Sequence, residues 1–200
     1  MQKRWDSSVD WISKIGPLEG AYTERLLTEV DYVVRTAARW NGNRLWETQF
    51  TVVSTDVNAI ATAGFGNATE KSAQGFAGMT YIWGSRTGIW LKPGPPREES
   101  IDTALHEWAH GVTSSYAGHD VSWRRVYGLS LHLWQVMYPK YPLKTSPCLR
   151  VKSTIGSYTE VWHNGGESYD EYQERCRKER RRICSSAQKM CLQLGFPGAA

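Results

Sequence analysis

Residues 103–112 read Thr-Ala-Leu-His-Glu-Trp-Ala-His-Gly-Val. His106 and His110 are four positions apart, a spacing that places both imidazoles on one face of an α-helix. Two such imidazoles can bind one metal ion, with ring nitrogens about 2.0–2.1 Å from zinc. Glu107 lies one step round the helix, where its carboxylate can take a proton from water without being a ligand. The stretch therefore predicts a helix that carries a zinc site and a general base.

The residues that flank this pattern are mostly apolar. Between Thr103 and Val112 the one charged residue is Glu107, so we expect the helix to be buried on nearly all sides. Two histidines and a carboxylate inside such a helix are costly unless they are paired or bound to a metal. The alternative interpretation, a surface helix with two histidines, is less favoured for this reason.

A catalytic zinc usually has three protein ligands and an open position for water. His119 is the best candidate for the third ligand, because it lies nine residues after His110. Ser114, Ser115 and Gly118 form a turn between them, which lets the chain reverse and bring His119 back to the metal.

A distant glutamate is the alternative third ligand, and Glu160 and Glu167 are the options. The metzincin pattern is excluded, because Thr113 stands where that pattern has glycine and Tyr116 where it has histidine.

The helices are predicted from apolar residues at three- and four-residue spacing and from capping residues at their ends. Asp120 is a plausible N-cap, and Ser168 with Glu171 has the pattern of a capping box. We expect helices over residues 17–40, 97–113, 120–137 and 168–194.

The strands are predicted between the first two of these helices. A β-rich stretch runs from Arg44, with apolar and polar residues alternating over 46–52, and the pattern leaves open whether 57–63 continues it. The glycine-rich segment 64–78 is predicted to be a loop. A hairpin is expected from strands 79–83 and 89–92, joined by a five-residue turn over 84–88. Helices around a small, mostly antiparallel sheet define an α+β fold.

The composition is that of an ordinary globular protein, with 200 residues, 40% hydrophobic and 22% charged. The net charge of +4 is mild. The sequence has no run of 18 apolar residues, so no membrane span is predicted. The N-terminus lacks the apolar core of a secretory signal. We therefore expect a cytoplasmic protein with reduced thiols. No Cys-x-x-Cys pair is formed by the four cysteines, Cys148, Cys176, Cys184 and Cys191.

Residues 103–112, followed by Gly-His-Asp-Val-Ser-Trp at 118–123, resemble the SprT-like zinc metalloprotease domain. The His-Asp-x-x-aromatic pattern is also similar to the related WLM-type proteases. The similarity extends over Met79 to Trp123 when the preceding hairpin is included. Many SprT proteins end in a zinc ribbon with paired Cys-x-x-Cys motifs, which this sequence lacks.

The resemblance implies a zincin fold of the minigluzincin type, with Zn²⁺ as the cofactor. It implies three zinc ligands, namely His106, His110 and His119. It also implies that Glu107 is the general base and acid, and that Trp123 packs behind the site. An edge strand beside the active-site helix would bind peptide in extended form, and Gly88–Lys92 occupies that position.

Other polar residues near the pattern have more than one interpretation. Asp120 is an N-cap, a hydrogen-bond partner of a histidine or a ligand, in that order of preference. Tyr116 and Tyr127 could stabilise an oxyanion, although core packing is favoured for both. His132 and His163 are expected to be structural or solvated.

The C-terminal segment is basic, since seven basic and four acidic residues lie between Ser168 and Ala200. Such a helix could bind DNA phosphates without sequence preference. A solvated face with the pairs Glu171–Arg175 and Glu174–Lys178 is the favoured alternative.

The sequence thus predicts a metalloprotease domain over residues 1–142 and a linker with a basic helical extension over 143–200. The predicted function is that of a zinc-dependent metallopeptidase that acts on a protein or peptide through metal-activated water and Glu107. The alternative is a nucleic-acid-binding or scaffold protein with a structural or vestigial zinc site.

Overall fold

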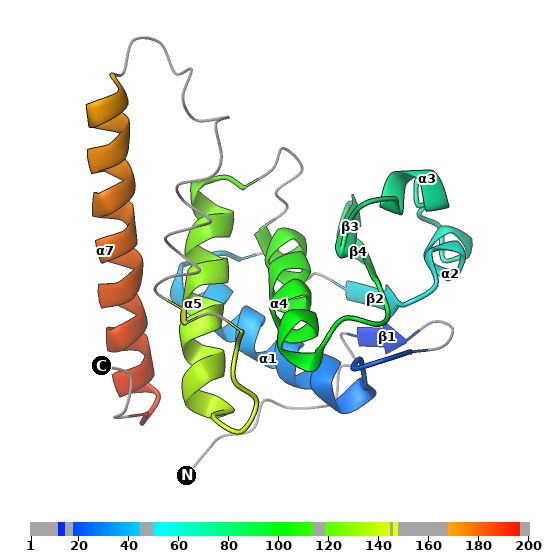
Figure 1. Ribbon diagram of the computed structural model, residues 1–200, viewed down its shortest axis with the longest axis horizontal. Coiled ribbons are helices and arrows are strands. Elements are labelled where there is room, and N and C mark those ends of the chain that lie inside the picture. Colours follow the sequence, from blue (N-terminus) through cyan, green and yellow to red (C-terminus); the bar gives the residue numbers. More distant parts are fainter. Residues whose placement is uncertain are drawn as a thin grey trace.

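The computed structural model of the protein describes residues 12–14, 18–44, 50–113, 119–144, 146–147 and 168–196. Within these ranges the structure has six helices and a four-stranded sheet, which confirms the α+β class (Figure 1). The strands are β1 (Ile12–Lys14), β2 (Phe50–Ser54), β3 (Gly78–Trp83) and β4 (Arg86–Leu91). The helices are α1 (Glu24–Trp40), α2 (Val57–Thr62), α3 (Glu70–Ala73), α4 (Arg97–Thr113), α5 (Val121–Met137) and α7 (Tyr169–Gln193). Helix α4 lies next to the strands, and α5 and α7 lie beyond it (Figure 1).

Helices α1, α5 and α7 each begin directly after a capping residue. Helix α4 has the predicted bounds, and α5 follows the N-cap Asp120, whose side chain accepts a hydrogen bond from the backbone N–H of Trp123. Helix α7 follows Ser168, which forms the predicted capping box with Glu171. Helix α1 begins later than residue 17, because Thr23 caps it.

Two short helices lie in segments for which no helix was predicted: the sequence left 57–63 open and predicted a loop over 64–78. The segment after β2 is helix α2, because the Asp56 side chain accepts a hydrogen bond from the N–H of Asn58 and caps it. The glycine-rich segment contains helix α3, which starts at a capping box of Thr69 and Ser72. The prediction of a loop throughout 64–78 was therefore wrong.

The sheet has the strand order β1-β2-β4-β3 and is mixed. The pairs β1–β2 and β2–β4 are parallel, and β3–β4 alone among the described strands is antiparallel. The predicted mostly antiparallel sheet was therefore wrong. The reason is that helices connect β1 to β2 and β2 to β3, and such crossovers allow parallel pairing that residue alternation in one strand does not reveal.

The edge strand next to α4 is β3, whereas the predicted edge Gly88–Lys92 lies in β4 and its end, between β2 and β3. The hairpin turn is also shorter than predicted. Trp83 pairs with Arg86, so Gly84 and Ser85 form a two-residue turn. Gly84 has a φ of 59°, a value that this kind of turn requires and that glycine adopts without strain.

Apolar side chains cover both faces of the sheet. On one face Val53 and Ile89 join the main core formed with α1, α4, α5 and α7. On the other face Val52 and Trp90 pack with Ile60 and the rest of a smaller cluster at α2 and α3. Alternation along β2 and β4 thus separates two cores, and Figure 1 shows α4 and the pair α2–α3 on different sides of the strands.

Helix α7 lies along α5, and its apolar residues Cys176 and Ile183 belong to the main core. Arg125 of α5 and Glu179 of α7 form an ion pair with an N–O distance of 2.6 Å. The boundary between residues 142 and 143 stays a prediction. No helix in the described part of the chain combines the length and apolar character needed to cross a bilayer.

Candidate metal centre

Helix α4 is buried along almost its whole length, as its apolar flanks predict, and none of its residues 98–113 is exposed. On the side of α1, the indole Nε1 of Trp108 donates a hydrogen bond to Oδ1 of Asp31 at 3.0 Å. Asp31 also pairs with Arg35, whose Nε lies 2.8 Å from the same oxygen. Burial raises the pKa of the Asp31 carboxyl, and Arg35 and Trp108 partly offset this rise.

The sheet supports α4 from the other side. Gly111 lies so close to β4 that a Cβ atom there would be 3.0 Å from Cγ2 of Thr87. Glycine therefore allows the helix to approach the strand at this point. Held by α1 and β4, the helix presents His106 and His110 next to the start of α5.

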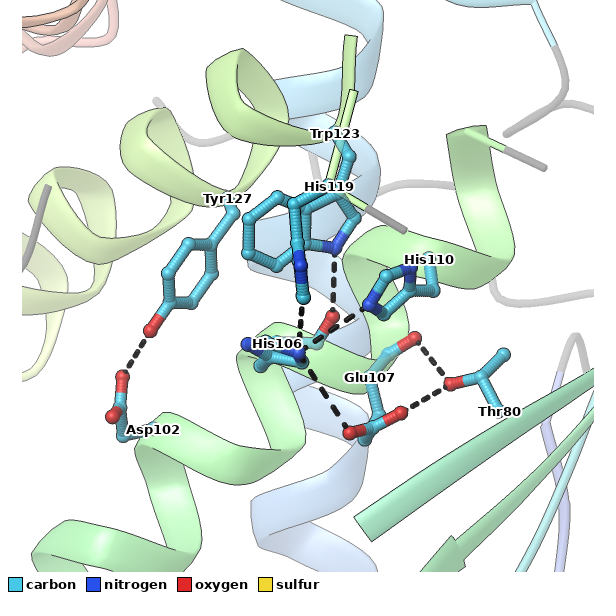
Figure 2. Close-up of polar contacts among 8 residues, drawn as sticks. All are labelled: Thr80, Asp102, His106, Glu107, His110, His119, Trp123 and Tyr127. Carbon is cyan, nitrogen blue, oxygen red and sulfur yellow. Dashed lines mark hydrogen bonds and ion pairs between the residues drawn. The ribbon is translucent and has the colours of Figure 1, made fainter. Parts of the chain in front are cut away.

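Three imidazoles converge at this place, as the sequence predicted (Figure 2). Nε2 of His106 lies 3.3 Å from Nε2 of His110 and 3.0 Å from Nε2 of His119. The ring centroids are 4.8–5.0 Å apart. Two nitrogens that bind one tetrahedral zinc at 2.0–2.1 Å lie about 3.3 Å apart, so the spacing fits a shared metal ion. The three histidines could therefore hold one metal ion.

His119 reaches this cluster because it directly precedes the N-cap of α5. Oδ1 of Asp120 accepts a hydrogen bond from the N–H of Trp123 at 2.7 Å, which confirms the N-cap interpretation of this aspartate. Burial lowers the pKa of His119 to about 4, and the positive charge of Arg124 contributes to the shift. At neutral pH the imidazole of His119 is uncharged, which is the form that binds metals.

Trp123 packs against all three imidazoles, in line with the place that the resemblance implied. Its ring centroid lies 4.7 Å from that of His106, 5.0 Å from His110 and 4.0 Å from His119. Its indole N–H also donates to the backbone carbonyl of His106 at 3.3 Å. The indole thus contacts all three imidazoles and restricts their orientation, while their Nε2 atoms converge (Figure 2).

Tyr127 extends this aromatic group one turn further along α5. Its ring stacks on Trp123 at 4.8 Å and meets His106 edge-on at 5.4 Å. Its hydroxyl donates a hydrogen bond to Oδ1 of Asp102 at 2.5 Å, one turn before His106 on α4. Tyr127 therefore links the two helices, in line with the packing role favoured from the sequence.

The carboxylate of Glu107 lies beside the imidazoles. Its Oε1 is 4.0 Å from Nε2 of His106, and its side chain is 9% exposed. Oγ1 of Thr80 lies 2.7 Å from Oε2 and 2.9 Å from the backbone carbonyl oxygen of Glu107. Burial raises the pKa of Glu107 to about 7, and the hydrogen bond from Thr80 opposes the rise. A carboxylate with this pKa can accept and return a proton near neutral pH.

Thr80 and Asp102 are site residues that the sequence did not reveal. Thr80 is 27 positions from Glu107 and lies on another element, so no local spacing joins them. Asp102 is four positions before His106, and this helical spacing was the available signal.

Several predicted candidates have other places. His132 is half-buried on α5, and burial lowers its pKa. Outside the described residues lie Glu160, Glu167, Tyr116, His163 and Cys148.

Comparison with known proteins gave no match: no family model, no curated protein and no solved structure is significantly similar to this chain.

Proposed function

We propose that the protein is a zinc-dependent metallopeptidase of the SprT-like or WLM type. The observation that supports this most is the Glu107 carboxylate beside three converging imidazoles on a buried helix. Three neutral nitrogen donors suit Zn²⁺, and a set of three protein ligands is typical of catalytic rather than structural zinc. The three rings are partly exposed, so solvent reaches the cluster.

The chemistry assigned to the residues is peptide hydrolysis. When bound, zinc supplies a Lewis acid that acidifies water and polarises a carbonyl. Glu107 takes a proton from the attacking water, whose oxygen bonds to the carbonyl carbon. Glu107 then returns this proton to the amide nitrogen as the C–N bond breaks, which leaves an acid and an amine. One carboxylate serves both transfers, since its Oε1 lies 4.0 Å from Nε2 of His106, next to the imidazole cluster.

The free edge of β3 supports a substrate in extended form. The backbone N–H of Lys92 donates to the carbonyl of Ala77 at 2.9 Å, so in this antiparallel ladder odd-numbered residues of β3 bond to β4. The backbone groups of Gly78, Thr80 and Ile82 therefore face the opposite side. No described strand pairs there, and a peptide could add as a further strand.

The test combines metal analysis with a cleavage assay. We expect about one zinc per chain by mass spectrometry, both in the wild type and in Glu107→Gln. Cleavage of casein should fall by roughly 100-fold or more in Glu107→Gln, because the proton acceptor is lost. Glu98→Gln in the first turn of the same helix is the matched control and should cleave normally. Native cleavage by Glu107→Gln would refute the mechanism.

The alternative is a nucleic-acid-binding or scaffold protein with a structural site. Lys178 and Arg182 are exposed one turn apart on α7, which supports contact with DNA phosphates. Arg177 and Arg181 both pair with Glu174, which supports a solvated face instead. A wild-type protein that binds zinc and DNA but cleaves no protein would favour this alternative.

A further inference from the structure

The side chain of Glu107 leaves α4 toward β3, the strand at the edge of the sheet (Figure 2). Its carboxylate is nearly enclosed, and Thr80 of β3 is its closest polar neighbour, with Oγ1 at 2.7 Å from Oε2. The same hydroxyl lies 2.9 Å from the backbone oxygen of Glu107. One threonine thus contacts both the backbone and the reactive end of this residue.

Gly78 supplies the space that the Glu107 side chain fills. A Cβ atom at position 78 would lie 2.8 Å from Cγ and 3.2 Å from Oε1 of Glu107, and 2.9 Å from Cγ2 of Thr103. The two carbon–carbon distances, 2.8 and 2.9 Å, are too short for carbon atoms in contact. Gly78 is not among the glycines with positive φ, so the space and not the backbone conformation requires glycine here.

We propose that β3 positions the general base: the Thr80 hydroxyl and the side-chain-free surface of Gly78 hold the Glu107 carboxylate in its working orientation. The proposal rests on the proposed function. Thr80 and Gly78 are positioning residues, since they act through Glu107.

The position of the carboxylate matters because a glutamate side chain has three rotatable bonds. With Oε2 bonded to Thr80, Oε1 remains 4.0 Å from Nε2 of His106, next to the imidazole cluster. A displacement of about 1 Å at a reacting group can reduce the rate roughly 100-fold. A fixed orientation of this side chain therefore has a direct effect on proton transfer.

Thr80 also connects the base to the proposed substrate edge. Its side chain points to Glu107, whereas its backbone N–H and C=O point to the free side of β3. A peptide that pairs with Thr80 would lie beside the carboxylate.

The experiment compares four variants with the wild type. Thr80→Val removes the hydroxyl and keeps the shape, and Thr80→Ser restores the hydroxyl. Gly78→Ala adds one methyl group against Glu107, and Gly66→Ala is its control, because no atom of the described residues lies within 4 Å of a Cβ there. Tyr81→Phe removes a neighbouring hydroxyl on the opposite face of β3, where it contacts Ser72 at 2.9 Å.

For Thr80→Val and Gly78→Ala we expect a roughly 10- to 100-fold lower kcat, with KM within about twofold, because the backbone edge is retained. Zinc content should stay near the wild-type value in Thr80→Val, whereas Tm should fall modestly because the buried carboxylate loses a hydrogen bond. Thr80→Ser, Gly66→Ala and Tyr81→Phe should keep the wild-type kcat. A normal kcat in Thr80→Val, or an equal loss in Thr80→Ser, would overturn the proposal.

A measurement without metal or substrate separates this proposal from the proposed function. The ¹³C resonance of the Glu107 carboxyl in metal-free protein is assigned by its loss in Glu107→Gln. It should shift in Thr80→Val and Gly78→Ala, and stay unchanged in Thr80→Ser and Tyr81→Phe. If the wild type cleaves no peptide, the proposed peptidase function is refuted. The resonance of the Glu107 carboxyl then tests by itself whether Thr80 and Gly78 position this side chain. An unchanged resonance in Thr80→Val then refutes it.

Discussion

Trp123 is a single indole that contacts every imidazole of the candidate metal centre. It is fully buried, stacks on His110 with an interplanar angle of 29° and meets the other two rings edge-on. Side chains behind a ligand restrict its rotation, so that less conformational entropy is lost when a metal binds. Trp123 is therefore expected to contribute to metal affinity as well as to stability.

Replacement of Trp123 by leucine should weaken zinc binding roughly tenfold and lower stability by on the order of 2 kcal/mol. Trp134 gives a matched control, because it is equally buried on the same helix and its N–H bonds to Tyr141. Trp134→Leu should lower Tm to a similar degree and keep the zinc affinity. Competition with a chelator measures the affinity, and equal zinc binding by the two variants would contradict the expectation.

The burial of His132 leads us to expect that the stability of the protein depends on pH. Burial lowers its pKa below the ordinary 6.5, so the unfolded chain binds a proton more readily than the folded chain. The neutral form contributes stability that is present above pH 6.5 and is lost as the pH falls through the folded-state pKa. His132→Gln should therefore lose less Tm than the wild type between pH 7.5 and pH 5. Parallel Tm curves for both proteins would exclude this role.

At the scale of elements, α1 carries two ion pairs of the same sequence spacing in different surroundings. Arg35 and Asp31 are buried behind α4, whereas the Arg25 side chain, paired with Glu29, is 81% exposed. A buried carboxylate that loses its partner is costly, while a solvated pair contributes little.

Arg35→Ala should therefore lower the free energy of unfolding by about 3–5 kcal/mol. Arg25→Ala, its matched control on the same helix, should leave it nearly unchanged, because the pair with Glu29 is solvated. Urea denaturation followed by circular dichroism gives both values. Similar losses in the two variants would show that the Asp31–Arg35 pair does not fix α1 against α4.

The sequence was most informative where an element is determined by its own residues. The starts of α5 and α7 follow from the caps Asp120 and Ser168, which act within one turn, and α4 has the bounds predicted from its residues. The predictions of a mostly antiparallel sheet and of Gly88–Lys92 as the edge strand were wrong, since strand direction and strand order depend on crossovers. A strand pattern records which faces are buried and carries no information on the partner.

The candidate site divides in the same way. His106, Glu107 and His110 are encoded by helical spacing, and His119 was chosen from its distance of nine positions after His110. The turn predicted at Ser114, Ser115 and Gly118 lies outside the described residues. The contact of Thr80 with Glu107 joins a strand to a helix and could not be predicted from spacing.

At the scale of the molecule, the three histidines join α4 to the segment that begins α5. A metal that binds there binds the folded chain and not the unfolded one, so it should stabilise the whole fold. At a free zinc concentration of 100 times Kd the gain is about 2.7 kcal/mol. Zinc should therefore raise Tm in the wild type and in His132→Gln, and leave Tm unchanged in His119→Ala. An unchanged wild-type Tm would argue against a metal site.

Helix α4 is held on one side by the hydrogen bond from Trp108 to Asp31 and on the other by the close approach of Gly111 to Thr87. This has a consequence for ion selectivity. A helix held on two sides cannot turn to enlarge the coordination sphere, and the cluster offers nitrogen donors only. Magnesium and calcium prefer six or more oxygen ligands and should compete poorly. Copper(II) accepts imidazole and exceeds zinc in the Irving–Williams order, and is thus the ion against which discrimination is most demanding.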